Sequence, residues 1–464
     1  MKRQAFVRGA GQPAASPSLH VPLRPAASAF PVVRPAASQR RFRSAAVEAA
    51  IAEFQGQVKD AELGWLFGNC FANTLDSNVT HSILSGRPDT YVRTGDLDAM
   101  SLRDSSMQVW PYLALVTHDA ALRQLVAGVI NRQTQCILQD PYANSFYADK
   151  AQAGGWQPGI HERKWGLDSL CHPIRLGYHY WKITGDEQPF DQQWHEAIRL
   201  TVNTLREQQR KAGPGPYRFQ RSTTNALDTQ ALAGAGYPAR PCGLIASAFR
   251  PSGDATLLPF SVPANFFAVA SLRQAALMLY DIAHEQAGYN ELMALADEIG
   301  WALRQYALVA HPTLGPVYAY EVDGYGGRVI MDDASVPGLL SLPYLGALPL
   351  NDASYQNTRQ LALSADNPFF FKGSAGEGIG SPHTGLDLIS PNSLAIRGLT
   401  SPNEAEIRAC VQALQAAQAG TGYLPEAFHK DDASQAIQPK SAGANALASA
   451  FLWKVYQEWP ALLA

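Results

Sequence analysis

The feature that most constrains the fold is an alternation of apolar helical repeats with long polar connections. Apolar residues recur every three or four positions in several segments, which gives a helix one apolar face. The clearest are 264–283 and 291–309, and shorter ones begin at Val47, Leu122, Trp194 and Leu447. Sustained strand alternation is rare, although a short run such as 317–322 can form a hairpin.

The connections between these helices are rich in Gly, Pro and polar residues. They span 85–104, 140–165, 213–263, 311–345 and 365–393. Loops of this length inside a compact domain are usually functional. Together with the length of 464 residues, the pattern predicts an all-α toroid whose loops gather at one mouth.

Composition bounds the class of protein. Hydrophobic residues make up 46% and charged residues 17%, as in a well-buried globular chain. The net charge of −3 gives no general attraction to nucleic acid or anionic membrane, and no run of about 18 apolar residues predicts a membrane span.

The five cysteines, Cys70, Cys136, Cys171, Cys242 and Cys410, are odd in number and widely spaced. We therefore expect reduced thiols in a cytoplasmic protein. Nothing indicates the oligomeric state.

The first 47 residues contain no Asp or Glu but eight Lys and Arg. They lack the apolar core of about 7–15 residues that a secretory signal needs. We predict an arm at 1–44 that lies over an acidic surface, followed by one domain at 45–464; a transit peptide is the alternative.

Two segments join Arg or Lys to carboxylates beside predicted helix starts. In 91–113, Arg103 and Asp104 can form a fork that holds adjacent sugar hydroxyls, although Asp104 can instead cap a helix. In 161–181, Lys164, Asp168 and His172 are spaced at one helical turn. Asp168 and His172 would then share a face, either as a structural pair or as a reader of hydroxyls.

Two more segments carry candidate acid–base groups. Arg250 and Asp254 precede the helix at 264–283, where burial would raise the pKa of a general acid; a surface turn is the alternative for Asp254. Glu426 lies in the loop before the last helix, where it is a candidate base or a solvated surface residue.

A further segment sets His383 among Gly378, Gly380 and Gly385, which indicates backbone lining a pocket. Asp332 and Asp333 are adjacent, but two carboxylates without a third ligand at fixed spacing are a poor metal signal. Phosphate-loop motifs are missing as well. We expect neither a metal nor a cofactor.

The candidate groups are carboxylates, Arg, His and aromatics, without a nucleophilic Ser or Cys motif. Hydrolysis of a glycosidic bond needs such a set, because one carboxylic acid protonates the leaving oxygen and a second carboxylate activates water.

These segments resemble glycoside hydrolase family 125, the exo-acting α-1,6-mannosidases. The matching stretches include RTGDLDAM at 93–100, HERKW at 161–165, VPANFFAV at 262–269, DDASVPGLLSLPYLG at 332–346 and GIGSPHTG at 378–385. The resemblance runs from about residue 45 to the C-terminus. It implies an (α/α)6 barrel, an inverting mechanism without metal and an oligosaccharide or glycan substrate.

The resemblance also implies roles for single residues. The general acid falls on Asp254 and the general base on Glu426. The sugar-holding positions fall on Arg103, Asp104, Lys164, Asp168, Arg250 and His383.

The chain departs from the family pattern by replacing large or charged residues with small ones. Ser101 stands for Trp, Gly166 for Glu, Gly253 for Asp and Ser390 for Trp; Gly443 marks another lost aromatic. Together they predict a wider, less polar pocket. An inverting glycosidase for another α-linked sugar, or a sugar-binding protein that does not catalyse, therefore stays an alternative to the α-mannosidase.

Overall fold

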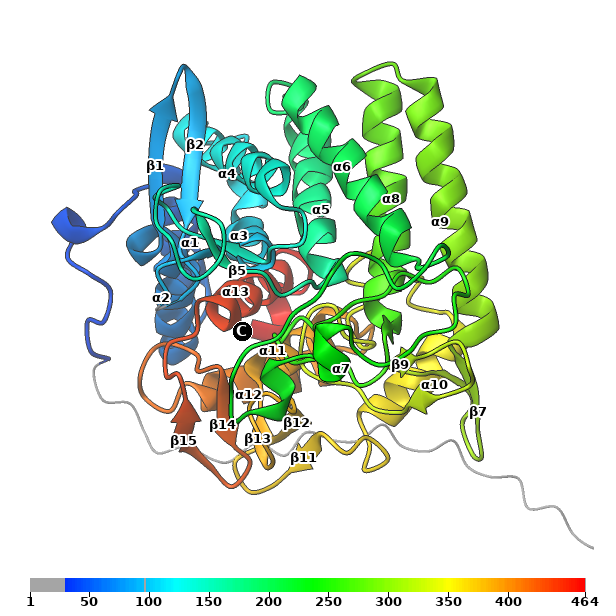
Figure 1. Cartoon of the computed structure of the whole chain (residues 1–464). Helices are drawn as coiled ribbons and strands as arrows, with labels where there is room; N and C mark the ends of the chain where they lie inside the picture. Colours follow the sequence, from blue (N-terminus) through cyan, green and yellow to red (C-terminus); the bar gives the residue numbers. More distant parts are fainter. Residues whose placement is uncertain (1–29, 96, 464) are drawn as a thin grey trace, which may run out of the picture.

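The computed structural model describes residues 30–95 and 97–463, and its framework is helical (Figure 1). The described residues form α1 (Ala45–Gln57), α2 (Ala61–Ser77), α3 (Leu102–Val109), α4 (Ala120–Gln139), α5 (Leu167–Thr184), α6 (Gln192–Gln208), α7 (Ala231–Gly234), α8 (Val262–Asp281), α9 (Gln286–Tyr306), α10 (Ala353–Ala362), α11 (Pro391–Leu399), α12 (Glu404–Ala417) and α13 (Ala442–Glu458). The prediction of a helix-rich fold is confirmed.

Side-chain caps explain where many of these helices begin. Asp60, Asp119 and Asp191 precede α2, α4 and α6, and each carboxylate accepts hydrogen bonds from two backbone N–H groups of the first turn. Such caps satisfy donors that a helix cannot satisfy itself.

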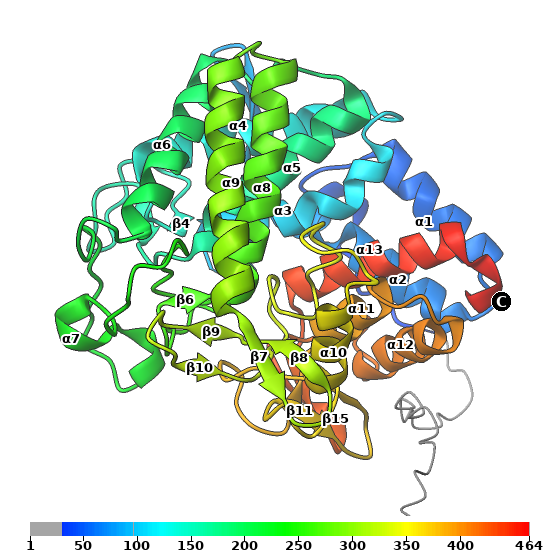
Figure 2. The same cartoon turned by 90° about the vertical axis from the view of Figure 1, so that its right-hand side faces the viewer.

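Five helices pack in sequence around the interior. α3 contacts α5 and α13, α5 contacts α8, and α11 contacts α13. α2 packs against α13, α4 against α3 and α5, α9 against α8, and α12 against α11 and α13. Figure 2 shows α8 and α9 as a long antiparallel pair. The inner helices thus carry the groups that face the centre of the molecule.

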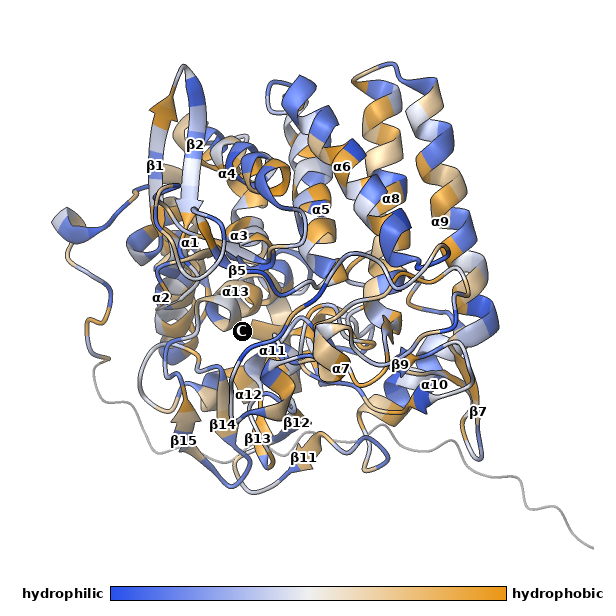
Figure 3. Cartoon of the chain, in the orientation of Figure 1, coloured by the Kyte–Doolittle hydropathy of each residue, from blue (hydrophilic) through white to orange (hydrophobic). Residues whose placement is uncertain are grey.

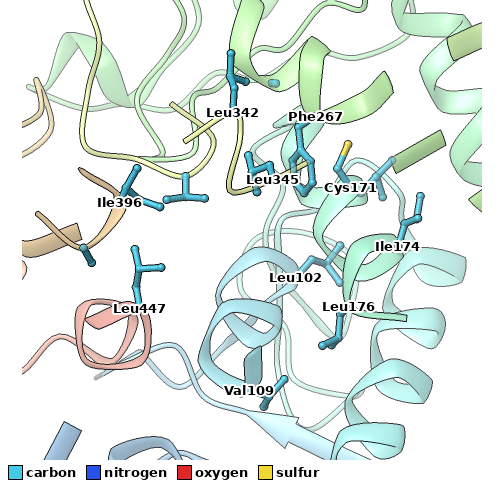
Figure 4. Close-up of a cluster of buried hydrophobic side chains, with 14 of the residues drawn as sticks. Leu102, Val109, Cys171, Ile174, Leu176, Phe267, Leu342, Leu345, Ile396 and Leu447 are labelled. Atoms are coloured by element: carbon cyan, nitrogen blue, oxygen red, sulfur yellow. The ribbon is translucent and has the colours of Figure 1, made fainter. Parts of the chain in front are cut away.

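The core fills the space between the inner helices. Figure 4 shows buried side chains from α3, α5, α8, α11 and α13 converging there with the segment after Gly338, and those labelled are Leu102, Val109, Cys171, Ile174, Leu176, Phe267, Leu342, Leu345, Ile396 and Leu447. Outer helices such as α9 alternate hydrophilic and hydrophobic residues along the ribbon (Figure 3), as expected when one face meets solvent.

Helix α8 differs from the amphipathic helix predicted at 264–283. It begins at Val262, and its buried residues cover nearly the whole circumference as far as Met278. In the described part of the chain, α8 alone is long and apolar enough to cross a membrane. Of its apolar 18-residue stretch, however, 83% is buried within the fold. A central core helix has these same properties.

Among the described residues, six small antiparallel sheets occupy the loops. The strands are β1 (Val79–Leu84) with β2 (Arg87–Val92); β3 (Met100–Ser101), β4 (Ser145–Phe146) and β5 (Ile160–Glu162); β6 (Phe260–Ser261), β9 (Glu321–Val322) and β10 (Arg328–Val329); β7 (Leu308–His311) with β8 (Gly315–Tyr318); β11 (Phe370–Lys372) with β12 (Glu377–Ile379); β13 (Leu388–Ile389), β14 (Ala427–His429) and β15 (Asp432–Ile437).

These strands correct two predictions. The run 317–322 is not one hairpin, because its first half pairs with β7 and its second half with β6 and β10. The segment 85–104 is not an irregular loop, because it contains β2 and the start of α3.

Of the predicted N-terminal arm, residues 1–29 lie outside the described residues. In the remainder, Arg34 forms ion pairs with Asp76 and Glu48, at 2.8 and 2.7 Å, and Arg40 pairs with Glu48 at 2.9 Å. The described end of the arm is therefore held to acidic groups of α1 and α2.

Candidate active site

A cavity of about 520 Å³ opens at the N-terminal ends of four inner helices. Its lining includes the residues that precede α3, α5, α11 and α13, namely Ser101, Gly166, Ser390 and Ser441. The first N–H groups of a helix lack intrahelical acceptors, and the helix dipole is positive at this end. Several positive helix ends therefore face one cavity, and they favour the binding of oxygen-rich groups there.

The first turn of α3 contributes a fork of one donor and one acceptor. Nε and Nη2 of Arg103 donate to the two carboxylate oxygens of Asp104, at 2.9 and 3.2 Å, and both side chains line the cavity. Ser101, rather than Asp104, caps α3, because its Oγ accepts from the Asp104 N–H at 3.1 Å. The alternative of Asp104 as a cap is therefore wrong.

Lys164 and Asp168 both line the cavity, Lys164 from a loop and Asp168 from helix α5. Helix α5 begins at Leu167, so the predicted helical spacing of Lys164 is wrong, and the Lys164 N–H is fixed instead by Asn144 Oδ1 at 2.8 Å. Its Nζ lies 2.6 Å from Asp228. Asp168 stands in the first turn of α5, 1% exposed, and burial raises its pKa to about 6 against the opposing charge of Arg103.

His172 does not belong to this site. It is buried, its Nε2 lies 3.2 Å from the carbonyl of Val336, and burial beside Arg175 lowers its pKa far below the usual value. The structural alternative for His172 is correct, whereas Asp168 lines the cavity.

Arg250 lines the cavity from a deeply buried position. It is 3% exposed, and its Nε donates to Oε1 of Glu321 at 2.6 Å. Glu321 is fully buried and also accepts from the N–H groups of Leu257 and Leu258. Glu321 was not predicted from the sequence, because no spacing rule links a carboxylate in a two-residue strand to an arginine 71 positions away.

A tight turn separates Arg250 from Asp254. Gly253 N–H donates to the carbonyl of Arg250, and the Arg250 N–H donates to the carbonyl of Asp254. Gly253 has φ +88°, a conformation that glycine adopts without strain, and it faces the cavity. Asp254 follows it and is 2% exposed.

His383 connects Asp254 to the cavity. Its Nδ1 donates to Oδ1 of Asp254 at 2.9 Å, and its ring lines the hollow. The bond to Asp254 is the main cause of a raised His383 pKa, which burial partly offsets. The imidazolium form is stabilised at a place where a substrate can meet it.

Glu426 lines the cavity directly before β14. Its N–H donates to the carbonyl of Ile437 at 3.1 Å, and its carbonyl accepts from Ser390 Oγ at 3.0 Å. Burial raises the pKa of its carboxyl group, and the nearby His383 acts in the opposite direction. The surface alternative for Glu426 is therefore wrong.

The small residues that distinguish this chain meet at the same cavity: Ser101, Gly166, Gly253, Ser390 and Gly443 all line it. A Cβ at Gly253 would meet Lys164 Nζ at 3.7 Å as its nearest described neighbour, and one at Gly443 would have no described atom within 4 Å. Space is thus free at both positions. At Gly166 a Cβ would come within 2.8 Å of Asp168 Oδ1, so this glycine makes room for the carboxylate.

The carboxylates of Asp332 and Asp333 accept hydrogen bonds from backbone N–H groups. Asp332 accepts from the N–H groups of Leu339 and Leu340, at 2.7 and 2.8 Å, and burial raises its pKa to about 8. Asp333 accepts from the Ser335 N–H at 2.8 Å. Across residues 30–95 and 97–463, no three His, Cys, Asp or Glu side chains are grouped so as to hold a metal ion.

Comparison with known proteins agrees with this geometry. Residues 60–453 match the family of metal-independent α-mannosidases, glycoside hydrolase family 125. The chain is 38% identical to the meiotically up-regulated gene 157 protein of Schizosaccharomyces pombe, over 94% of this chain and 90% of that protein. It is 36% identical to a metal-independent α-mannosidase from Streptococcus pneumoniae, solved with α-1,6-mannobiose in a non-productive complex, with a TM-score of 0.86 over 90% of this chain and all of that one.

A more distant likeness concerns the fold alone. A bacterial glucoamylase complexed with acarbose is 13% identical, with a TM-score of 0.56 over 87% of this chain and 56% of that one. The family match and the two closer relatives cover most of the chain, including the segments that build the cavity. The chain therefore belongs to glycoside hydrolase family 125, the metal-independent α-mannosidases.

Proposed function

We propose that this protein is an inverting exo-glycosidase that removes terminal α-1,6-linked mannose from oligosaccharides or glycans. The observation that carries the proposal is the meeting of Glu426 with the Asp254–His383 pair at a single cavity, from segments far apart in the chain. The binding of α-1,6-mannobiose by the streptococcal relative supports the choice of linkage. We also propose that the inner helices and their outer partners close an (α/α)6 barrel around this cavity.

Unpartnered polar atoms at the cavity support a sugar ligand. Oδ2 of Asp168 and Nη2 of Arg250 are buried without a hydrogen-bond partner in the described part of the chain. Such groups are costly unless a ligand or water satisfies them. A mannose hydroxyl both donates and accepts, so one hydroxyl can satisfy Asp168 and another Arg250, with the Arg103–Asp104 fork holding a vicinal pair.

The proposed reaction uses one acid and one base. Asp254 is the general acid, and it protonates the glycosidic oxygen while the bond to the anomeric carbon breaks. Glu426 accepts a proton from water as the water oxygen attacks the opposite face of that carbon. The sugar therefore leaves with the anomeric configuration inverted, and the substrate gains one water overall.

The expected result of a direct assay is hydrolysis of α-1,6-mannobiose with β-mannose as the first product. Proton NMR recorded before mutarotation distinguishes the two anomers. A first product of the α configuration contradicts inversion, and hydrolysis only of another aryl α-glycoside contradicts the choice of mannose. Binding of mannosides without any turnover makes the protein a sugar-binding member of the family.

Activity is expected to survive removal of metal ions. Both carboxylate oxygens of Asp332 accept from backbone N–H groups, and in the described part of the chain no three His, Cys, Asp or Glu side chains are grouped to hold a metal ion. The assay compares rates after dialysis against EDTA with rates in added calcium. A loss of turnover in EDTA that calcium restores would contradict this prediction.

A further inference from the structure

We propose that Asp228 is a positioning residue of the active site, which holds the ammonium group of Lys164 where it can donate to a sugar hydroxyl. The inference rests on the proposed function and deepens it, because it names a second carboxylate on which the binding of the substrate depends. Asp228 lies in the long connection 213–263, where no residue before Arg250 was predicted to have a role.

The ammonium group of Lys164 lies beside the turn that carries Asp254. Lys164 lines the cavity, and a Cβ at Gly253 would meet its Nζ at 3.7 Å. The same group is close enough to His383 to lower the pKa of that imidazole. A sugar whose glycosidic oxygen reaches Asp254 therefore comes close to the ammonium group.

Asp228 is the carboxylate that meets this ammonium group most closely among the described residues. Nζ of Lys164 lies 2.6 Å from Oδ1 of Asp228 and 3.7 Å from Oε1 of Glu162. Both oxygens of Glu162 are engaged at shorter distances, Oε1 by Arg221 at 2.6 Å and Oε2 by Asn144 at 3.0 Å. The position of the ammonium group therefore depends mainly on Asp228.

The segment around Asp228 is fastened to the turn that carries the proposed acid. Asp228 ends the short 3₁₀ helix Ala226–Asp228. The carbonyl of Leu227, one residue earlier, accepts a hydrogen bond from the N–H of Ala255 at 2.7 Å. Because Ala255 directly follows Asp254, the counter-ion of the ammonium group and the proposed acid are held by the same backbone contact.

The chemistry of the pair indicates that Asp228 acts through Lys164. The two carboxylate oxygens of Asp228 both face cations, since Oδ1 meets Lys164 and Oδ2 lies 3.5 Å from Arg221. An ammonium group carries three N–H donors, so an ion pair with one oxygen leaves donors for a ligand. Its four-carbon stem is flexible, and without a counter-ion the group would lose its fixed direction.

The test is a double-mutant cycle of Asp228→Asn and Lys164→Gln. Initial rates on α-1,6-mannobiose give kcat/KM for the parent, both single variants and the double variant. The same four proteins with Glu426→Gln added give the dissociation constant of mannobiose by calorimetry, because the sugar is then not consumed. Thermal unfolding of each protein shows whether it is folded.

The two single variants should weaken binding, and their effects should not add. Lys164→Gln should lower kcat/KM about 10–100-fold, because it removes a charged donor. Asp228→Asn should lower it about 10-fold while Lys164 is present, mainly through KM, because the donor is misplaced. In the Lys164→Gln background, Asp228→Asn should change kcat/KM less than about twofold, since no ammonium group is left to direct.

A second Asp–Lys pair provides a matched control. Oδ2 of Asp281, the last residue of α8, lies 3.6 Å from Nζ of Lys182, near the end of α5 that is opposite to the cavity. Asp281→Asn should therefore leave kcat/KM and the dissociation constant unchanged. Losses from Asp228→Asn that are equal in the two backgrounds overturn the inference, and so does parental kcat/KM in either single variant.

Failure of the proposed function is visible in the parent protein alone. A parent that binds mannobiose without hydrolysing it refutes the proposed activity, and the cycle of dissociation constants then decides the role of Asp228. A parent that neither binds nor hydrolyses α-mannosides refutes both the proposed function and this inference.

Discussion

Replacing Glu426 with Gln is expected to lower kcat about 10²–10⁴-fold on both α-1,6-mannobiose and 4-nitrophenyl α-mannoside. The amide keeps the shape of the side chain but cannot accept the proton of the attacking water. Because water must be activated whatever the leaving group, the two substrates should lose activity alike. Initial rates at saturating substrate, over a pH series, measure the effect.

The equal loss on two substrates separates the base from the acid. Replacing the general acid should lower the rate less on the activated aryl mannoside than on mannobiose. Replacing the base should lower both rates alike. Glu404→Gln is a matched control, because Glu404 is an exposed carboxylate in the first turn of α12 and should leave kcat unchanged. If Glu426→Gln keeps more than about a tenth of the activity on both substrates, Glu426 is not the base.

Helix α9, which has one solvent face, could be predicted from the periodicity of its apolar residues, whereas α2 could not. α9 was predicted at 291–309 and forms at Gln286–Tyr306, because its buried residues recur at helical spacing. α2 is buried around most of its circumference from Leu63 to Asp76, so its apolar residues show no periodicity, and it was missed. Most strands were missed because they are only two to four residues long, too short to show an alternation of apolar and polar residues.

The site was predictable where its contacts are local or lie within recognised family segments. Arg103 and Asp104 are neighbours in sequence and form the expected fork. The bond between His383 and Asp254 joins residues 129 positions apart, and no spacing rule predicts it. Residue types gave candidates for the acid, but the tight turn at Gly253, where φ is +88°, is a property of the folded chain.

The second large effect is expected on stability, when the buried ion pair between Arg250 and Glu321 is broken. Glu321→Ala is expected to cost about 3–5 kcal/mol of unfolding free energy, because it leaves the Arg250 guanidinium, with its side chain 2% exposed, without its countercharge. It also removes the acceptor of the Leu257 and Leu258 N–H groups. The midpoint and slope of urea unfolding measure the loss.

A surface ion pair tests whether burial causes this effect. Arg273 and Asp297 lie 3.0 Å apart, with side chains 51% and 66% exposed, so Asp297→Ala should cost no more than about 1 kcal/mol. Equal losses in both variants would contradict the argument from burial. Since Arg250 lines the cavity, Glu321→Ala should also weaken mannoside binding under conditions where the variant stays folded, because the guanidinium loses the contact that fixes its orientation.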